Sequence, residues 1–119
     1  MSHSPQDVHK KILGRKGEKA VAKYLKKSGM KILHRNFKTP FGEADLVAED
    51  NDEVAFVEVK TRTGDSYGNG KEAVGKTKQQ RYYKIAQYYS LQKGRELNAR
   101  FDVAEVSADL EIEYYKNAF

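Results

Sequence analysis

Apolar and polar positions along the chain follow two periods, and these periods predict the secondary structure. Residues 5–27 and 77–93 have apolar side chains three and four positions apart, which is typical of amphipathic helices. Short runs rich in β-branched and aromatic residues predict strands at 31–37, 43–49, 54–62, 100–106 and 110–114. This order of one helix, three strands, a second helix and one or two closing strands predicts a domain of the α/β class.

The ends of both helices carry sequence signals. Ser4 followed by Pro5 predicts the start of the first helix, although two glycines in its first half leave a start near residue 12 as an alternative. The segment that begins at Thr77 matches a capping box, which predicts Thr77 as the N-cap of the second helix. Gly94 predicts the end of that helix.

The third predicted strand carries charged residues where a buried strand is expected. Residues 54–62 are apolar on both faces, which is typical of a central strand, yet Glu58 and Lys60 lie near its end on one face. A hairpin with its loop at 50–53 places Asp45 directly opposite Glu58. Two carboxylates so close together must either share a proton or bind a cation.

A hard divalent cation fits this pair, because Mg²⁺ binds one or two carboxylates together with water and substrate phosphate. We expect Glu18, which borders the apolar stripe of the first helix, to be a third carboxylate and Lys60 to orient the attacking water. The alternative for Asp45, Glu58 and Lys60 is a buried ion-pair triad. Glu43 shares a strand face with Asp45 and is interpreted as a solvated strand end rather than an outer part of the site.

The charge is divided into blocks, which indicates the kind of partner. The chain has 119 residues, a net charge of +5 and no Cys, so thiolate-held zinc and cysteine nucleophiles are excluded. Residues 1–38 have eleven Lys and Arg against two acids, and 76–100 have seven against one, whereas 39–75 have nine acids against three. Two basic segments around an acidic one predict a polyanion-binding surface beside a cation site, with solvated helix faces as the alternative.

Three motifs, in this order, resemble a known family. They are Gly17-Glu18-Lys19-Ala20, Gly42-Glu43-Ala44-Asp45-Leu46-Val47 and Val57-Glu58-Val59-Lys60-Thr61-Arg62. Together they resemble the bacterial UPF0102 (YraN-like) family, which looks like a branch of the PD-(D/E)xK nuclease superfamily close to archaeal Holliday-junction resolvases. The resemblance runs from about Leu13 to Val106, with Ala44 in place of the proline in the superfamily's name.

The resemblance implies an α-β-β-β-α-β core, with a mixed sheet flanked by helices, and a metal-dependent endonuclease that acts on branched DNA such as Holliday junctions or flaps. It places the catalytic residues at Glu18, Asp45, Glu58 and Lys60. The ligands of Mg²⁺ or Mn²⁺ would be Asp45, Glu58, the Val59 carbonyl and Glu18. Two alternatives are a non-catalytic nucleic-acid-binding module of the same fold and an RNA nuclease.

Four residues are expected to contact nucleic acid, with DNA favoured over RNA: Arg62, Tyr67, Lys78 and Arg81. Lys78 and Arg81 lie in the first turn of the second helix, where cations oppose the helix dipole and phosphate contacts would offset that penalty. A solvated helix face is the alternative for both. Tyr67, in a glycine-rich loop, either stacks on an unpaired base or packs the loop down.

We expect a single nuclease-like domain over residues 1–119, with its core at 12–106 and a flexible or frayed extension at 1–11. No apolar run is long enough for a membrane span and no secretory signal is evident, so a cytoplasmic protein without a membrane partner is expected. A homodimer is compatible with the sequence. Paired tyrosines are expected in the core and at its rim, at Tyr82-Tyr83, Tyr88-Tyr89 and Tyr114-Tyr115.

Overall fold

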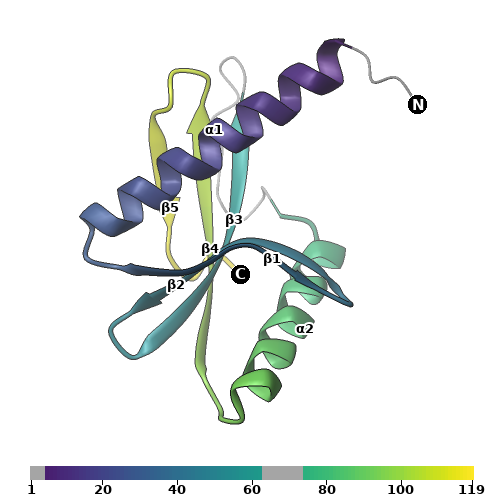
Figure 1. Cartoon of the computed structure of the whole chain (residues 1–119), viewed down its shortest axis with the longest axis vertical. Helices are drawn as coiled ribbons and strands as arrows, with labels where there is room; N and C mark the ends of the chain where they lie inside the picture. The colour runs from purple at the N-terminus through teal and green to yellow at the C-terminus, as the bar shows by residue number, and fades with distance from the viewer. Residues whose placement is uncertain (1–4, 63–73) are drawn as a thin grey trace.

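The chain folds into a five-stranded sheet with one helix packed on each face (Figure 1). The computed structural model describes residues 5–62 and 74–119, with side chains from residue 12 onward. Its elements are α1 (Pro5–Lys27), β1 (Lys31–Thr39), β2 (Gly42–Asp50), β3 (Glu53–Arg62), α2 (Lys76–Lys93), β4 (Asn98–Ser107) and β5 (Ile112–Tyr115). The mixed α/β architecture and the α-β-β-β-α-β order of the core are therefore confirmed.

The spatial order of the strands follows the chain, β1-β2-β3-β4-β5, which places β3 at the centre as its apolar faces predicted. Strand β3 pairs with β4 in parallel, and α2 lies between these two strands in the chain. The other neighbouring pairs are antiparallel. In the part of the chain that the structure describes, neither helix has the length and hydrophobicity needed to cross a membrane.

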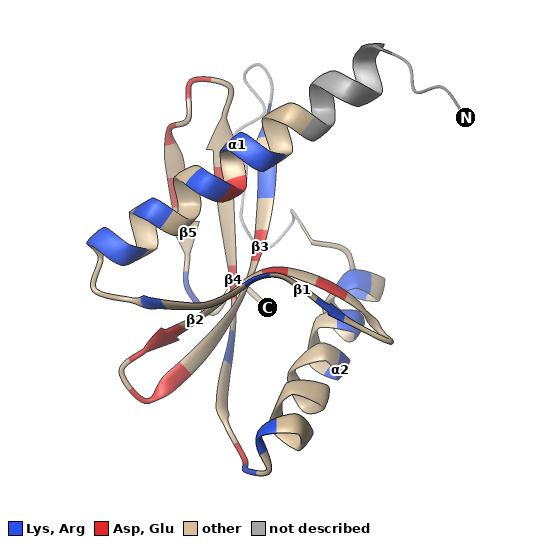
Figure 2. Ribbon diagram, viewed as in Figure 1, with Lys and Arg blue, Asp and Glu red and all other residues tan. Residues whose placement is uncertain are grey.

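The charge blocks of the sequence become separate surfaces of the fold. Lys and Arg line α1 and the first turns of α2, whereas Asp and Glu gather at the turn between β2 and β3 (Figure 2). Arg100, only 2% exposed, is an exception: it forms ion pairs with Asp50 and with Asp102, each at 2.9 Å. Asp102 also accepts hydrogen bonds from the Tyr114 hydroxyl and from the Asn117 amide. This buried network ties β4 to the acidic turn and to the end of the chain.

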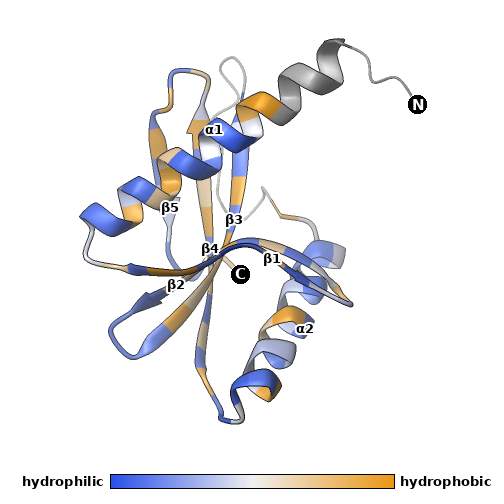
Figure 3. Ribbon diagram, viewed as in Figure 1, coloured by the Kyte–Doolittle hydropathy of each residue, from blue (hydrophilic) through white to orange (hydrophobic). Residues whose placement is uncertain are grey.

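Apolar side chains form one core on each face of the sheet. Hydrophobic segments lie along the strands of the sheet that the two helices enclose (Figure 3). Helix α1 contributes Val21, Ala22 and Leu25 to the first core. Gly17 lets this helix approach β3 closely, because a Cβ there would lie 2.9 Å from the Thr61 methyl group. The second core is covered by the predicted face of α2, formed by Tyr82, Ile85, Ala86 and Tyr89. The remaining paired tyrosines are half-buried at the rim, as expected: Tyr83, Tyr88, Tyr114 and Tyr115.

The structure corrects one predicted helix end and confirms the others. Helix α1 begins at Pro5, the earlier of the two predicted starts, and α2 ends at Gly94, whose φ of 68° is left-handed. The N-cap of α2 is Gly75 and not Thr77, so the capping-box prediction is wrong. The N-cap lies two residues earlier than predicted because Val74, only 3% exposed, is packed in a core cluster, so that the chain enters the helix at Gly75.

The hairpin formed by β2 and β3 has the predicted register. Glu49 faces Val54 and Val47 faces Phe56. The strands are longer than predicted, because Asp50 pairs with Glu53 and leaves a turn of only two residues. The residue that allows this tight turn is an asparagine in the left-handed region, at position 51 with φ 57°. The register that brings acidic residues of β2 and β3 together is therefore confirmed.

Candidate functional site

The sheet forks at the position of Asp45. Strands β2 and β3 pair only as far as Leu46 and Val57, while beyond this point β2 stays paired with β1 and β3 with β4. Asp45 is the first β2 residue past the last pair, and its Oδ2 accepts a hydrogen bond of 2.8 Å from the Val59 amide. The carboxylate thus replaces the missing partner of β3. A fork of this kind leaves the same side chains accessible to elements on both faces of the sheet.

A cleft of about 500 Å³ lies at the fork. Its lining residues come from α1, β2, β3 and α2: Leu13, Gly14, Glu18, Asp45, Glu58, Val59, Lys60, Thr61 and Lys78. All four predicted catalytic residues, Glu18, Asp45, Glu58 and Lys60, therefore line one cavity. They are joined there by Val59, expected as a backbone ligand, and by Lys78, expected as a phosphate contact.

The carboxylates of this cleft disfavour one another's charge. Burial and the nearby charge of Glu58 raise the pKa of Asp45 from 3.8 to about 8, although the hydrogen bond from the Val59 amide opposes the rise. The pKa of Glu18 is also raised, by burial and by the charge of Glu43. At neutral pH the cluster therefore holds a proton, as expected for opposed carboxylates without a cation.

Glu58 is held by two side chains of α2. It is 5% exposed, and its Oε2 accepts a hydrogen bond of 2.6 Å from the Tyr82 hydroxyl. Its Oε1 forms an ion pair with the Lys78 ammonium. The Asp45 amide donates to the Tyr82 oxygen at 3.4 Å, so one tyrosine contacts both strands of the fork. Burial and the charge of Glu58 raise the pKa of Tyr82, which keeps its hydroxyl protonated and able to donate.

Tyr82 is a site residue that the sequence reasoning assigned only to the core. The available signal was chemical: a tyrosine on a buried helix face needs a partner for its hydroxyl, and a leucine there would not. Lys78 lines the cleft, where its ammonium forms an ion pair with Glu58. It is therefore not part of a purely solvated helix face, which was the alternative for this residue. Arg81, one turn further along α2, is exposed, and it lines a small neighbouring pocket together with Lys78 and Gly42.

Asn36 links the first carboxylate of the cleft to its outer edge. With its amide nitrogen turned toward the acids, Asn36 donates to Glu18 Oε2 at 3.1 Å and to Glu43 Oε1 at 3.0 Å. Glu43 is exposed, as its interpretation as a solvated strand end requires. Its charge nevertheless contributes to the raised pKa of Glu18, so it also acts on the site.

Of the two further predicted nucleic-acid contacts, Arg62 lies within the described part of the chain. Arg62 is half-buried and extends toward β4, where its Nη2 lies 3.9 Å from Glu105 Oε1. Tyr67 lies outside the described residues, so its two interpretations stay as predictions.

The donor set suits a hard divalent cation, since carboxylate oxygens and a backbone carbonyl are the ligands that Mg²⁺ and Mn²⁺ prefer. Among the side chains that the structure describes, at residues 12–62 and 74–119, no three acidic or histidine side chains are grouped closely enough to hold an ion as they stand. Glu58 is instead paired with Lys78, and Asp45 is protonated at neutral pH. Cation binding therefore requires the Lys78 ammonium to leave Glu58 and Asp45 to lose its proton.

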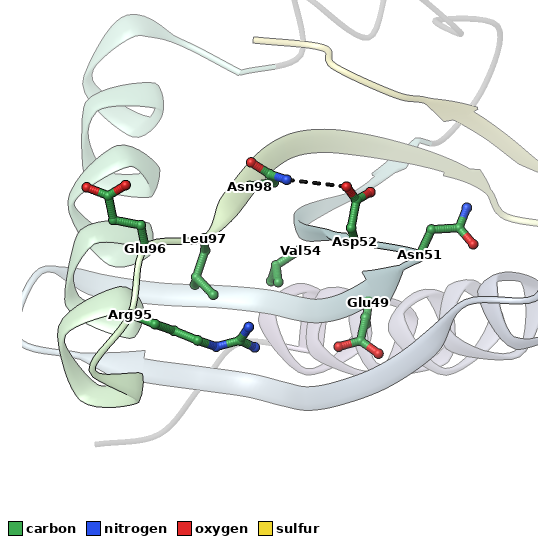
Figure 4. Close-up of a pocket in the computed structure, with 8 residues that line it drawn as sticks. All are labelled: Glu49, Asn51, Asp52, Val54, Arg95, Glu96, Leu97 and Asn98. Carbon is green, nitrogen blue, oxygen red and sulfur yellow. Dashed lines mark hydrogen bonds between the residues drawn. The ribbon is translucent and has the colours of Figure 1, made fainter.

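A second cavity, of about 540 Å³, lies between the β2–β3 turn and the start of β4 (Figure 4). It is lined by Glu49, Asn51, Asp52, Val54, Arg95, Glu96, Leu97 and Asn98. Its side chains come from the acidic end of the molecule, and Asn98 donates to Asp52 there at 3.5 Å. None of the predicted site residues lines it, so the candidate chemistry is confined to the cleft at the fork.

Comparison with known proteins agrees with the motifs in the cleft. The model of a family described as "Uncharacterised protein family UPF0102" matches residues 17–106, which include every carboxylate of the cleft. A UPF0102 protein of Thermodesulfovibrio yellowstonii is 44% identical over 107 residues, covering 90% of this chain and 95% of the relative. One from Caldanaerobacter subterraneus is 48% identical over 100 residues, covering 83% and 82%. A third, from Caldicellulosiruptor saccharolyticus, is 41% identical over 118 residues, covering 94% of this chain and 100% of the relative. The chain therefore belongs to the UPF0102 family.

Proposed function

We propose that this protein is a divalent-metal-dependent endonuclease that hydrolyses phosphodiester bonds in DNA. The observation that carries the proposal is the convergence of Glu18, Asp45 and Glu58 from three separate elements on one cleft, beside two lysines. A purely structural cluster gains nothing from an arrangement that raises the pKa of Asp45 to about 8. A bound divalent cation would attract each ionised carboxylate and would thereby offset their mutual repulsion.

Asp45, Glu58, the Val59 carbonyl and Glu18 would hold the ion. When bound, Mg²⁺ or Mn²⁺ supplies a water of lowered pKa and offsets charge on the scissile phosphate. Tyr82 orients Glu58 through the hydrogen bond to Oε2, which leaves Oε1 for the cation once Lys78 has moved.

The two lysines have separate tasks. Lys60 lines the cleft next to Glu58 and would position the attacking water and offset the negative charge that develops on the phosphate. Lys78 lines the same cleft, and once it is released from Glu58 its ammonium would be in reach of a substrate phosphate. The Lys78 ammonium would then pair with a substrate phosphate in place of the Glu58 carboxylate. Binding of the metal would therefore favour binding of the substrate.

The proposal includes a preference for branched DNA and action in the cytoplasm. Symmetric cleavage of a four-way junction requires two active sites, so on that substrate the protein would act as a homodimer.

A second candidate, a nucleic-acid-binding module without turnover, is favoured by one observation: Glu58 is already neutralised by Lys78. An RNA nuclease is distinguished from both by its substrate alone.

The test is cleavage of end-labelled four-way-junction, flap and linear DNA, and of matching RNA, in Mg²⁺ or Mn²⁺. Wild type is compared with Asp45→Asn, Glu58→Gln and the control Asp109→Asn, which changes an exposed carboxylate in the β4–β5 turn. We expect metal-dependent DNA cleavage by wild type and the control, and its loss in both site variants. Binding without cleavage would leave only the binding module, and cleavage of RNA alone would replace DNA as the substrate. Equal activity in all four proteins would contradict the site.

A further inference from the structure

The two sides of the cleft present different chemistry. On one side, α1 carries several blue segments in Figure 2, and between residues 15 and 27 its acid is Glu18, which lines the cleft. The exposed residues of this stretch include six cations: Arg15, Lys16, Lys19, Lys23, Lys26 and Lys27. The opposite face of the same helix is buried through Gly17, Val21 and Leu25, and Glu18 lies on this sheet-facing side, in the cleft. Gly14, which directly precedes Arg15, also lines the cleft. The basic face therefore starts at the edge of the candidate site.

This basic face is electrostatically unfavourable for the protein alone. Its cations are three or four positions apart, the spacing at which like charges on a helix repel. Within the described part of the chain, none of them forms an ion pair. The nearest aromatic, Tyr24, is 40% exposed but packs against Tyr114, with ring centroids 5.9 Å apart. A surface with cations and no available aromatic ring suits the phosphates of a duplex, whose bases are stacked inside.

On the side of α2, the β1–β2 hairpin carries an exposed aromatic ring outside the cleft. Phe41 is 44% exposed at the tip of the β1–β2 hairpin, and its amide donates to Thr39 Oγ1 at 3.0 Å, which fixes the turn. The Lys84 ammonium lies 5.9 Å from the centre of the Phe41 ring, and the Tyr88 ring lies edge-on at 6.4 Å. Aromatic rings beside cations are the elements with which proteins bind unpaired bases.

The hairpin tip lies next to a small pocket that shares a lining residue with the cleft and is also lined by the exposed acid Glu43. Gly42, next to Phe41, packs against the Arg81 side chain, since a Cβ there would lie 3.7 Å from Arg81 Cδ. Arg81 and Gly42 line a small pocket that shares Lys78 with the cleft. A strand leaving the cleft past Lys78 would therefore reach Arg81 and then Phe41.

We propose that the cleft receives nucleic acid at a boundary between duplex and single strand. The face of α1 binds phosphates of the duplex, and Phe41 stacks on an unpaired base of the departing strand, with Arg81 and Lys84 on its phosphates. This inference rests on the proposed function for the position of the scissile bond, and it narrows the substrate to molecules such as forks and flaps. Binding alone is enough to test it.

The experiment measures binding in EDTA, where metal-dependent cleavage does not occur. The probes are a DNA fork with 2-aminopurine at the first unpaired positions, a blunt duplex and a single strand of the same sequence. For the α1 face, one triple variant replaces Lys16, Lys19 and Lys23 with Gln. Its control has the same change in charge away from this face, near the acidic β2–β3 turn and the end of α2, and replaces Lys31, Lys93 and Arg95 with Gln. For the tip, Phe41→Ala is compared with Leu91→Ala, which removes an 81% exposed side chain of α2, and with Phe41→Trp.

We expect the α1 variant to lose about tenfold or more in affinity for duplex and fork, and to reduce the salt dependence by about two to three charges. Phe41→Ala should lose about tenfold for fork and single strand only, together with the quenching of 2-aminopurine, which Phe41→Trp retains. Equal losses for duplex and single strand in both variants, unchanged quenching in Phe41→Ala, or no difference from the controls would overturn the proposal. Thermal melting verifies that each variant is folded. Failed cleavage by a protein that shows this binding pattern would remove the nuclease and leave the inference intact.

Discussion

Replacing Asp45 with Asn removes the charge that the cleft disfavours most. Asn is close in size to Asp, and its side-chain oxygen retains the acceptor for the Val59 amide. Because the neutral amide is not repelled by Glu58 or Glu18, the substitution mimics the protonated carboxyl. We therefore expect Asp45→Asn to abolish metal-dependent activity while it raises the free energy of unfolding.

The size of this gain depends on pH. Because the pKa of Asp45 is about 8 in the folded protein and 3.8 in its ordinary environment, the folded state binds more protons between these values. The contribution of Asp45 to stability is therefore highest in acid and falls as the pH rises toward 8. At about 1.4 kcal/mol per pKa unit, the gain from Asn has a ceiling of about 5 kcal/mol at pH 8 and about 2 kcal/mol at pH 5. Relaxation of the cleft lowers both values but keeps their order.

Urea unfolding followed by circular dichroism at pH 5 and pH 8, without divalent metal, measures the gain. Asp109→Asn is the matched control, because it makes the same substitution at an exposed position. An Asp45→Asn protein no more stable than wild type at pH 8 would show that the Asp45 charge is not disfavoured in the cleft. A gain of the same size at both pH values would also refute the reasoning, since the cause would then be something other than the raised pKa.

Three further expectations concern the cation, the helix contact and the buried ion pairs. Mg²⁺ should raise the melting temperature of wild type more at pH 8 than at pH 6, because Asp45 must lose its proton to bind; calorimetry that shows the reverse order would contradict this. Gly17→Ala should destabilise by about 1–3 kcal/mol, since its Cβ would lie 2.9 Å from a β3 side chain, whereas Gly14→Ala, with nothing within 4 Å, should stabilise the helix by up to about 1 kcal/mol. Urea unfolding compares the two, and similar effects would argue against close packing at Gly17. Arg100→Met should cost about 3–5 kcal/mol in the same assay, because it leaves the fully buried Asp102 without its cation, and a loss below 1 kcal/mol would contradict the role of that pair.

The sequence predicted the part of the site that depends on strand geometry. Alternation along β3 and a short hairpin were enough to bring Asp45 and Glu58 to the same place, because the register of a hairpin follows from its turn. The fork was not predicted: pairing of β2 with β3 ends at Leu46 and Val57, so Asp45 and Glu58 are not a cross-strand pair. Glu18 was also within reach of sequence reasoning, since it borders the apolar stripe that faces the sheet. The cleft brings together the residues that these local rules selected.

The contacts that depend on how α2 docks were not predictable from local patterns. Tyr82 and Lys78 reach Glu58 only because α2 packs against the sheet at the fork. The periodicity of apolar residues predicts which face of a helix is buried, but not where along the sheet the helix packs. The start of α2 was misplaced for a related reason, as the burial of Val74 decides where the helix begins. The ion pairs that Arg100 forms with Asp50 and Glu53 have no local sequence signal, because these two partners come from distant positions in the chain.

Binding of a divalent cation by the carboxylates of the fork is the claim on which the account depends. Isothermal titration of Mn²⁺ into wild type and Asp45→Asn at pH 7.5, in two buffers of different ionisation enthalpy, measures both affinity and proton release. The account predicts saturable binding by wild type, with protons released as Asp45 ionises, and loss of that binding in the variant. No saturable binding by wild type, or equal binding by both proteins, would contradict it.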